Sequence, residues 1–329
     1  MISRKLSVFL CSLVLGLGSG SGLSGQAWAA QGFAGGAPAS WWESKTGSPV
    51  SLSQVVEQIR PGSVVLVGEI HNSPLHSQAQ VDLLKTMALQ GLKFDVGMEL
   101  IAFLHQRKLN QYLMGEMSEE DFLRQSEWGA FSWDLYREQV LMPLAFGGHT
   151  WALNVPRLIS NKVARGGLES LSEKERKYFV PPEFTVGNDH YRERFEAIIE
   201  DQHGGHKMPP EIMNRWFTAQ SLWDDYMAYI ASLVRQKRPD QVMVIFVGQF
   251  HVAYGGGLKD RLMARGVPPD KILTISQDFI FPDENLEEVA GRDSIPHPVY
   301  GPLADFLQYS PFEAAEEESH VEMADPSAP

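Results

Sequence analysis

The sequence predicts an α/β protein: a mostly parallel sheet with helices on both faces and a long helical insertion between the third and fourth strands. Short apolar runs rich in β-branched residues, which are typical of buried strands, alternate along the chain with longer helical patterns. One interval between such runs, residues 158–239, is much longer than the others and carries helical patterns. Strands that alternate with helices form parallel sheets covered on both faces.

The first residues have the pattern of an export signal. Arg4 and Lys5 precede an apolar stretch over residues 6–17, and Ala27-Trp28-Ala29 fits the A-x-A rule for cleavage. We therefore expect residues 1–29 to be a signal peptide. The mature protein is then expected to be periplasmic or associated with the cell surface.

Composition excludes several functional classes. The formal net charge of -13 argues against nucleic-acid binding, which needs a basic face. The single cysteine, Cys11, lies inside the predicted signal, so the mature chain has no disulfide and no thiolate metal site. Leu10 precedes Cys11 where a lipoprotein site prefers a small residue, and a lipid anchor is not expected.

The rest of the chain divides into a linker, a domain and a tail. Residues 30–49, rich in Gly, Ala, Ser and Pro, are predicted to be a linker to an α/β domain over 50–311, and the Glu-rich residues 312–329 a disordered acidic tail. The predicted strands cover 63–67, 93–98, 150–155, 242–247 and 272–275. The predicted helices cover 51–59, 76–89, 103–113, 118–126, 133–145 and 211–236, with Ser51 and Ser118 as N-caps.

Two similar tetrads follow two of the predicted strands. They are Gly68-Glu69-Ile70-His71 and Gly248-Gln249-Phe250-His251, whose histidines are 180 residues apart. In open α/β sheets, ligands bind in the crevice beyond the carboxyl ends of the strands. The tetrads therefore predict a site to which His71 and His251 both contribute.

Two other strand ends carry polar residues, Glu99 after the second strand and Arg157 after the third. Imidazoles and carboxylates suit Zn, Mn or Co, which makes His71, Glu99 and His251 a candidate metal set. Glu69 or Glu99 is then a candidate general base. His76, at the entry of a predicted helix, is a further candidate for the same crevice.

Further candidates lie in the insertion and after the second tetrad. His203 and His206 flank two glycines, and Tyr254 follows His251 by three residues; imidazole and phenolate both ligate haem iron. Asp224 lies beside an apolar stripe of the 211–236 helix, and a buried carboxylate needs a partner. Arg157 is the candidate partner.

Several short motifs occur here in the order in which the ChaN-like haem-binding lipoprotein family has them, and the chain resembles that family over roughly residues 50–280. The motifs are Val65-Leu66-Val67-Gly68-Glu69-Ile70-His71-Asn72-Ser73-Pro74-Leu75-His76, Gly97-Met98-Glu99, Asn154-Val155-Pro156-Arg157, Ala164-Arg165-Gly166-Gly167-Leu168, His203-Gly204-Gly205, Gln220 through Met227, and Gly248-Gln249-Phe250-His251.

The resemblance implies an exported haem-binding protein with a role in haem or iron acquisition. It implies an α/β fold with a helical insertion, partners in the haem-uptake machinery, and haem at a homodimer interface with Tyr ligation, for which Tyr254, Tyr226 and Tyr229 are candidates. We expect His71, His76, Glu99 and His251 to line the crevice, Arg157 to neutralise a propionate, and His203 and His206 to close over the haem.

The wider group, which includes the Tiki and TraB proteins, implies a different function. There, paired Gly-x-x-His motifs and a Glu are associated with metal-dependent peptidase activity, and His71, Glu99 and His251 match that set. The alternative prediction is therefore a metal-dependent hydrolase that holds a divalent ion such as Mn, Co or Zn.

Overall fold

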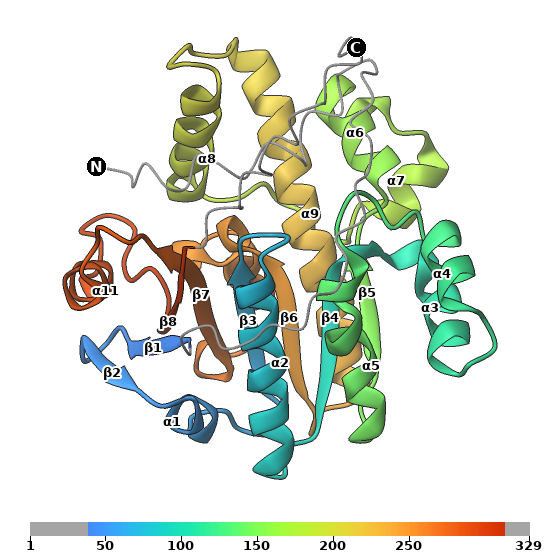
Figure 1. Ribbon diagram of the computed structural model, residues 1–329. Helices are drawn as coiled ribbons and strands as arrows, with labels where there is room; N and C mark the ends of the chain where they lie inside the picture. The colour runs from blue at the N-terminus through green and yellow to red at the C-terminus, as the bar shows by residue number, and fades with distance from the viewer. Residues whose placement is uncertain (1–38, 313–329) are drawn as a thin grey trace, which may run out of the picture.

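The fold is built around a mixed sheet in a computed structural model that describes residues 39–312 (Figure 1). In this part of the chain, the eight strands lie in the order β2-β1-β8-β7-β3-β6-β4-β5. All neighbours from β8 to β5 are parallel, and β1 pairs with both β2 and β8 in antiparallel fashion. The strands are β1 (Ser40–Glu43), β2 (Ser48–Val50), β3 (Val64–Glu69), β4 (Phe94–Ala102), β5 (Thr150–Asn154), β6 (Val242–Gly248), β7 (Ile272–Ile280) and β8 (Phe306–Pro311).

Helices cover both faces of the sheet, which confirms the predicted fold class. Successive side chains of a strand point to opposite faces. Accordingly, Val65 and Val67 of β3 pack on one face with α1 to α5, whereas Val64 and Leu66 pack on the other with α6, α8, α9 and α10. The helices are α1 (Leu52–Glu57), α2 (Pro74–Leu89), α3 (Gln106–Leu113), α4 (Glu119–Gln125), α5 (Arg137–Ala145), α6 (Arg157–Gly166), α7 (Glu173–Phe179), α8 (Asp189–Gln202), α9 (Pro210–Lys237), α10 (Leu258–Ala264) and α11 (Leu286–Ser294).

Serine caps set the starts of several helices. Ser51 accepts a hydrogen bond from the Gln54 amide in a capping box, and Ser118 accepts one from the Asp121 amide, so both predicted N-caps are confirmed. Ser73 caps α2 in the same way, with Pro74 at the first helical position. The cap fixes the turn between β3 and α2, in which His71 lies.

The long interval between β5 and β6 contains the helices α6 to α9. In Figure 1, α6 and α8 lie above the upper edge of the sheet, at the carboxyl ends of the parallel strands, and α9 runs from there down to the sheet. Because α9 contacts both α6 and the strand β5, it joins this helical region to the sheet. Side chains of α9, a helix of the insertion, can therefore reach the carboxyl ends of the strands.

The structure corrects the predicted organisation at one edge of the sheet. The strand β1 (residues 40–43) and all but the last residue of β2 (residues 48–50) lie in the stretch 30–49 that was predicted to be a linker. The sequence pattern also does not predict β8, which lies between β1 and β7. β1 and β2 are short, and β1 and β8 pair with each other although they are remote in sequence, so local patterns did not reveal these strands. The predicted signal peptide and nearly all of the predicted tail lie outside the described residues.

Candidate functional site

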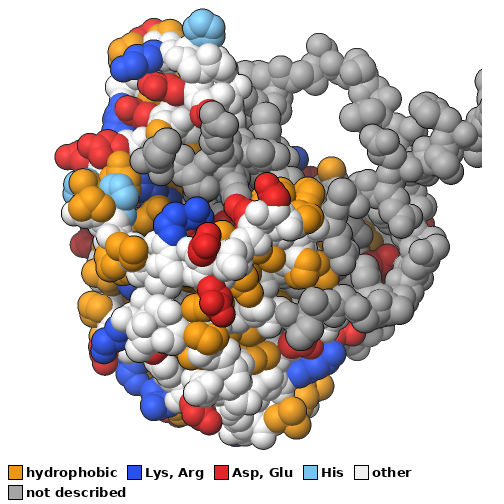
Figure 2. Space-filling model, turned by 60° about the vertical axis from the view of Figure 1, so that its left-hand side comes forward, with side chains coloured by type: hydrophobic (Ala, Val, Ile, Leu, Met, Phe, Trp, Pro, Cys, Tyr) orange, Lys and Arg blue, Asp and Glu red, His pale blue; other side chains and the backbone are white. Residues whose placement is uncertain are grey.

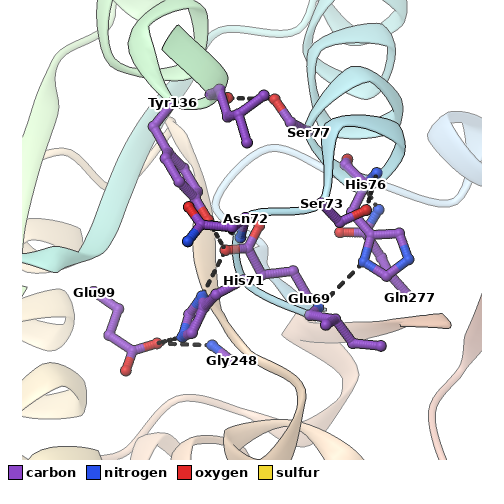
Figure 3. Close-up of polar contacts among 12 residues, drawn as sticks. Glu69, His71, Asn72, Ser73, His76, Ser77, Glu99, Tyr136, Gly248 and Gln277 are labelled. Atoms are coloured by element: carbon purple, nitrogen blue, oxygen red, sulfur yellow. Dashed lines mark hydrogen bonds and ion pairs between the residues drawn. The ribbon is translucent and has the colours of Figure 1, made fainter. Parts of the chain in front are cut away.

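The two tetrads meet at the carboxyl ends of adjacent strands. β3 and β6 pair in parallel, and the register places Glu69 beside Gly248. Glu99 lies on β4, the neighbour of β6 on its other side. Figure 3 shows the Glu69, His71 and Glu99 side chains pointing toward one another at this edge. The structure thus brings together the residues predicted to share a crevice.

Glu69 holds the His71 ring through one hydrogen bond and is itself held by Tyr136 and Gln80. His71 Nδ1 lies 2.7 Å from Glu69 Oε1. The Tyr136 hydroxyl donates to the same oxygen at 2.8 Å, and Gln80 Nε2 donates to Oε2 at 2.5 Å. Glu69 is 4% exposed, so these contacts replace the solvent that a carboxylate would otherwise bind. Glu69, itself held by Tyr136 and Gln80, therefore fixes the orientation of the His71 ring.

Glu99 lies between the two imidazoles. His251 Nε2 is 3.3 Å from Glu99 Oε1, and His71 Nε2 is 4.0 Å from Oε2. The backbone amide of Gly248 donates to Oε2 at 2.7 Å. Glu99 is 1% exposed, so both histidines face a buried carboxylate.

On its other side, His251 is held by the helical region. His251 Nδ1 lies 2.7 Å from Oδ1 of Asp224, on α9. The hydroxyl of Tyr191, on α8, donates to Asp224 Oδ2 at 2.8 Å. Acidic and imidazole groups therefore alternate in one series. We call it the carboxylate–imidazole chain; its members are Glu69, His71, Glu99, His251 and Asp224.

The charges in this series shift its pKa values strongly. Burial alone would raise the pKa of Glu99, but the charges of His251 and His71 and the hydrogen bonds from His251 and Gly248 lower it to about 2. Burial alone would lower the pKa of His251, but Glu99 and Asp224 raise it to about 10. For His71, the hydrogen bond to Glu69 and the charges of Glu69 and Glu99 likewise outweigh burial and raise the pKa. At neutral pH, Glu99 and His251 form a charged pair.

Two glycines allow backbone to approach these groups. A Cβ on Gly248 would lie 3.2 Å from His71 Nε2, so glycine leaves space next to that nitrogen. Gly257 has φ +61°, and a Cβ there would lie 2.9 Å from Asp224 Oδ1 and 3.0 Å from the Tyr191 hydroxyl. The segment after His251 therefore passes directly against the Asp224 carboxylate.

Two predicted site residues lie apart from this series. His76 is fully buried, accepts a hydrogen bond from the Ile70 amide on Nδ1 (3.2 Å), and stacks on Phe279 with ring centroids 4.6 Å apart. It is a core residue behind the β3–α2 turn rather than part of the crevice surface. Arg157 is exposed at the start of α6. The predicted Arg157–Asp224 pair is wrong, because Asp224 binds His251 and Tyr191 instead.

The histidines of the insertion are distant from the strand ends. His203 follows α8, where its Nδ1 lies 2.7 Å from the Ile199 carbonyl and its ring lies beside Trp216. His206 is exposed in the α8–α9 connection, which Figure 1 places at the end of α8 and α9 away from the sheet. The structure brings neither residue to the carboxylate–imidazole chain.

The candidate tyrosines occupy different surroundings. Tyr226 is buried on α9, and Tyr229 packs under Arg265. Tyr254 has φ 59°, which is rare for a residue with a side chain, and its ring lies over the guanidinium of Arg194 at 4.7 Å. Only Tyr254, among these candidates, lies in the segment that directly follows His251.

Sequence reasoning missed Tyr136, Gln80 and Tyr191, which orient the two outer carboxylates. Tyr136 and Tyr191 lie in helical stretches without a recognisable motif, and Gln80 lies one helical turn after His76 in α2. The turn that places His76 on α2 also places Gln80 one turn further along, so helical spacing could have suggested Gln80. Nothing in the local sequence indicated the tyrosines.

The alternative metal centre finds no support in residues 39–312. Within that range, no group of three His, Cys, Asp or Glu side chains is arranged to hold a metal ion. Across the same residues, no helix has the length and apolar character needed to span a membrane.

Comparison of structures finds relatives at low sequence identity. The structure of cofacial haem binding to ChaN of Campylobacter jejuni is 16% identical with a TM-score of 0.57, and the match covers 82% of this chain and 96% of that chain. A mutant erythromycin esterase in its open conformation is 12% identical with a TM-score of 0.42, over 73% of this chain and 77% of its own. At such identities the ChaN structure supports the fold.

Comparison of sequences identifies the family. No curated protein matches the chain. However, the profile of the family described as "Haem-binding uptake, Tiki superfamily, ChaN" matches residues 55–262, which is more than half of the chain and includes every motif from the first tetrad to the second. This match confirms the resemblance inferred from the motifs, and the protein belongs to the ChaN family of the Tiki superfamily.

Proposed function

We propose that the protein binds haem and acts in haem or iron uptake. The observation that carries this proposal is the family match over residues 55–262, since the family is described by haem binding and uptake. The likeness of the fold to ChaN of Campylobacter jejuni, whose structure is described as binding haem cofacially, supports it.

The carboxylate–imidazole chain fits a haem poorly. Its three carboxylates outnumber its two imidazoles, so it repels the propionates that a haem carries. Both ring nitrogens of His251 already lie within 3.3 Å of carboxylate oxygens, which leaves no nitrogen for iron. A haem requires instead a reachable donor, an apolar surface and a nearby cation.

The surface around Tyr254 fits these requirements better. Tyr254, His297 and Tyr300 form a cluster of partly buried rings, with centroids 4.3 Å apart for His297 and Tyr300 and 5.7 Å for Tyr254 and Tyr300. Ile295 and Val299 are 70% and 53% exposed. Figure 2 views the side of the molecule on which α8 and α11 lie, where hydrophobic side chains are interspersed with basic, acidic and histidine ones.

Positive charge adjoins this ring cluster. Arg194 lies beneath Tyr254. The Cδ of Lys259 lies 3.6 Å from the position of a Cβ on Gly255, and its Nζ lies 3.9 Å from Asp305 Oδ2. Burial raises the pKa of Tyr254, the charge of Arg194 offsets only part of that rise, and the charge of Asp293 adds to it. In this proposal Tyr254 ligates the iron and Lys259 neutralises a propionate. A bound haem would supply the iron as cargo for uptake.

Haemin titration of the purified protein tests the proposal. We expect a saturable Soret shift, and we expect Tyr254→Phe to weaken haemin binding at least tenfold. Tyr178→Phe is the matched control, because Tyr178 is an exposed tyrosine on α7. Absence of a saturable Soret change would refute haem binding, and equal binding by both variants would refute the role of Tyr254.

Export and a homodimer complete the proposal. The signal pattern supports export, with Ala30 as the first mature residue. N-terminal sequencing of protein recovered from the periplasmic fraction tests this, and an intact Met1 there would contradict it. Light scattering with and without haemin tests the homodimer, for which we expect twice the monomer mass when haemin is bound.

A further inference from the structure

The carboxylate–imidazole chain has no part in the proposed haem site, yet it has the groups of an acid–base centre. We propose that Glu69 and His71 hydrolyse small neutral or cationic carboxylic esters without a metal ion. His71 would be the catalytic residue and Glu69 the residue that positions it.

The hydrogen bonds around Glu69 favour one tautomer of His71. Glu69 accepts from the Tyr136 hydroxyl and from Gln80, so its oxygens are fixed before they meet the ring. An ionised carboxylate can only accept, so His71 Nδ1 must be the donor in their 2.7 Å contact. Against the effect of burial, Glu69 and Glu99 raise the pKa of His71, so the ring becomes neutral only as the pH rises through that pKa, and Nε2 then carries the lone pair that a general base needs.

His71 is the member of the series that a substrate can reach. Its side chain is 13% exposed, against 3% for Glu69, 1% for Glu99 and 6% for His251. Next to Nε2 lies Gly248, where even a Cβ would come within 3.2 Å. The absence of a side chain there leaves room beside the nitrogen, and the edge of the partly buried Phe131 ring, 5.1 Å from the His71 ring, provides an apolar wall.

Charge selects the class of ester. The series contains three carboxylates and at most two imidazolium ions, so its net charge is negative even when both rings are protonated. An anionic ester would be repelled, whereas a neutral or cationic one would not. Glu99, 4.0 Å from His71 Nε2, also stabilises the positive charge that forms on His71 during proton transfer.

The reaction is a general-base hydrolysis. His71 Nε2 takes a proton from a water molecule while the water oxygen bonds to the carbonyl carbon of the ester. The tetrahedral anion then expels the alcohol oxygen by breaking the carbon–oxygen single bond. The leaving oxygen takes the proton from His71 Nε2, which restores the neutral ring, and the acid product releases its remaining proton to solvent.

Hydrolysis of 4-nitrophenyl acetate by haem-free protein in EDTA tests the proposal. General-base catalysis contributes typically about 10²–10⁴-fold. We therefore expect His71→Gln to lower the rate at least 100-fold, while His206→Ala, which removes an exposed histidine far from the site, leaves it unchanged. We also expect hydrolysis of the neutral 4-nitrophenyl acetate to exceed that of the anionic 4-nitrophenyl hydrogen succinate, which has the same leaving group.

Glu69 has a separate test. Glu69→Gln should lower the rate at least tenfold, and Glu69→Asp, which keeps a carboxylate, should retain more activity than Glu69→Gln in folded protein. A purely structural role would not make activity depend on the charge at this position.

Three results would overturn the proposal: equal rates for the wild type and His71→Gln, loss of wild-type activity in EDTA, or preference for the anionic ester. If His71→Gln does not fold, carbethoxylation of the wild type by diethyl pyrocarbonate replaces it. Inactivation must then follow modification of His71, as mapped by peptide mass. Because no haem is present, these outcomes are independent of the haem proposal.

Discussion

Burial of a neutral His76 should make folding stability depend on pH. The ring is fully buried against Phe279, and this burial lowers the pKa of His76 to about 4, although the charge of Glu69 and backbone hydrogen bonds oppose the shift. In the unfolded chain the pKa returns to about 6.5. Between these values the unfolded state binds more protons than the folded state, so stability falls as the pH falls through this window.

The magnitude follows from the two pKa values. At pH 7.5 both states are neutral at His76, and the residue makes no pH-dependent contribution. At pH 5 the unfolded imidazole is almost fully protonated while the folded one is not, which destabilises the fold by about 2 kcal/mol. Below pH 4 the loss levels off, because the folded imidazole also takes up its proton.

Comparison with His76→Asn isolates this contribution. Asn keeps an acceptor near the position of Nδ1 but does not titrate. A reference variant is needed because His251, with its pKa raised to about 10, contributes stability that is complete below pH 6.5 and lost as the pH rises toward 10. Urea unfolding at pH 7.5 and pH 5 should show that the wild type loses about 2 kcal/mol more than the variant. Equal losses would refute the reasoning.

Three further substitutions test the stability of the fold, two of them in the site and one in α11. Glu99→Gln should cost about 2 kcal/mol at pH 7, because the buried His251 loses one of its two carboxylate partners and keeps only Asp224; a loss below about 1 kcal/mol in urea unfolding would contradict this. Gly257→Ala should cost about 2 kcal/mol by the same measurement, because its Cβ would meet Asp224 at 2.9 Å and φ is +61°. Gly291→Ala, in the interior of α11 with open space around the new Cβ, should instead stabilise by roughly 0.5–1 kcal/mol and raise Tm in a thermal scan.

The sequence allowed the centre of the site to be predicted because its geometry follows from strand direction alone. Parallel strands end at one edge, so polar residues directly after β3 and β6 had to meet there, whatever else the chain did. Glu69, His71, Glu99 and His251 were found in this way, and all four lie within the residues that the family profile matches. Predicting that these four residues meet therefore required no knowledge of how the helices pack.

The partners that orient these residues could not be predicted, since they depend on how helices pack on the sheet. Asp224 was recognised as a carboxylate in need of a partner, but the choice of Arg157 rested on charge rather than on the path of α9. Tyr136 reaches Glu69 only because α5 packs beside α2, and sequence periodicity does not encode that contact. β1 and β8 escaped for a similar reason, because they pair with each other from opposite ends of the described chain, whereas β2 is only three residues long and pairs with β1 in a short hairpin.

The central position of β3 has a consequence for synthesis of the chain. Both of its neighbours, β6 and β7, lie much later in sequence, since the register joins Val64 to Met243 and to Ile272. At about 5–20 residues per second, a ribosome needs roughly ten to thirty-five seconds to move from β3 to β6. Throughout that time an apolar strand with two unpaired edges waits for partners that do not yet exist. Nascent chains that stall before residue 242 should therefore aggregate or occupy chaperones, whereas those that pass β7 should not.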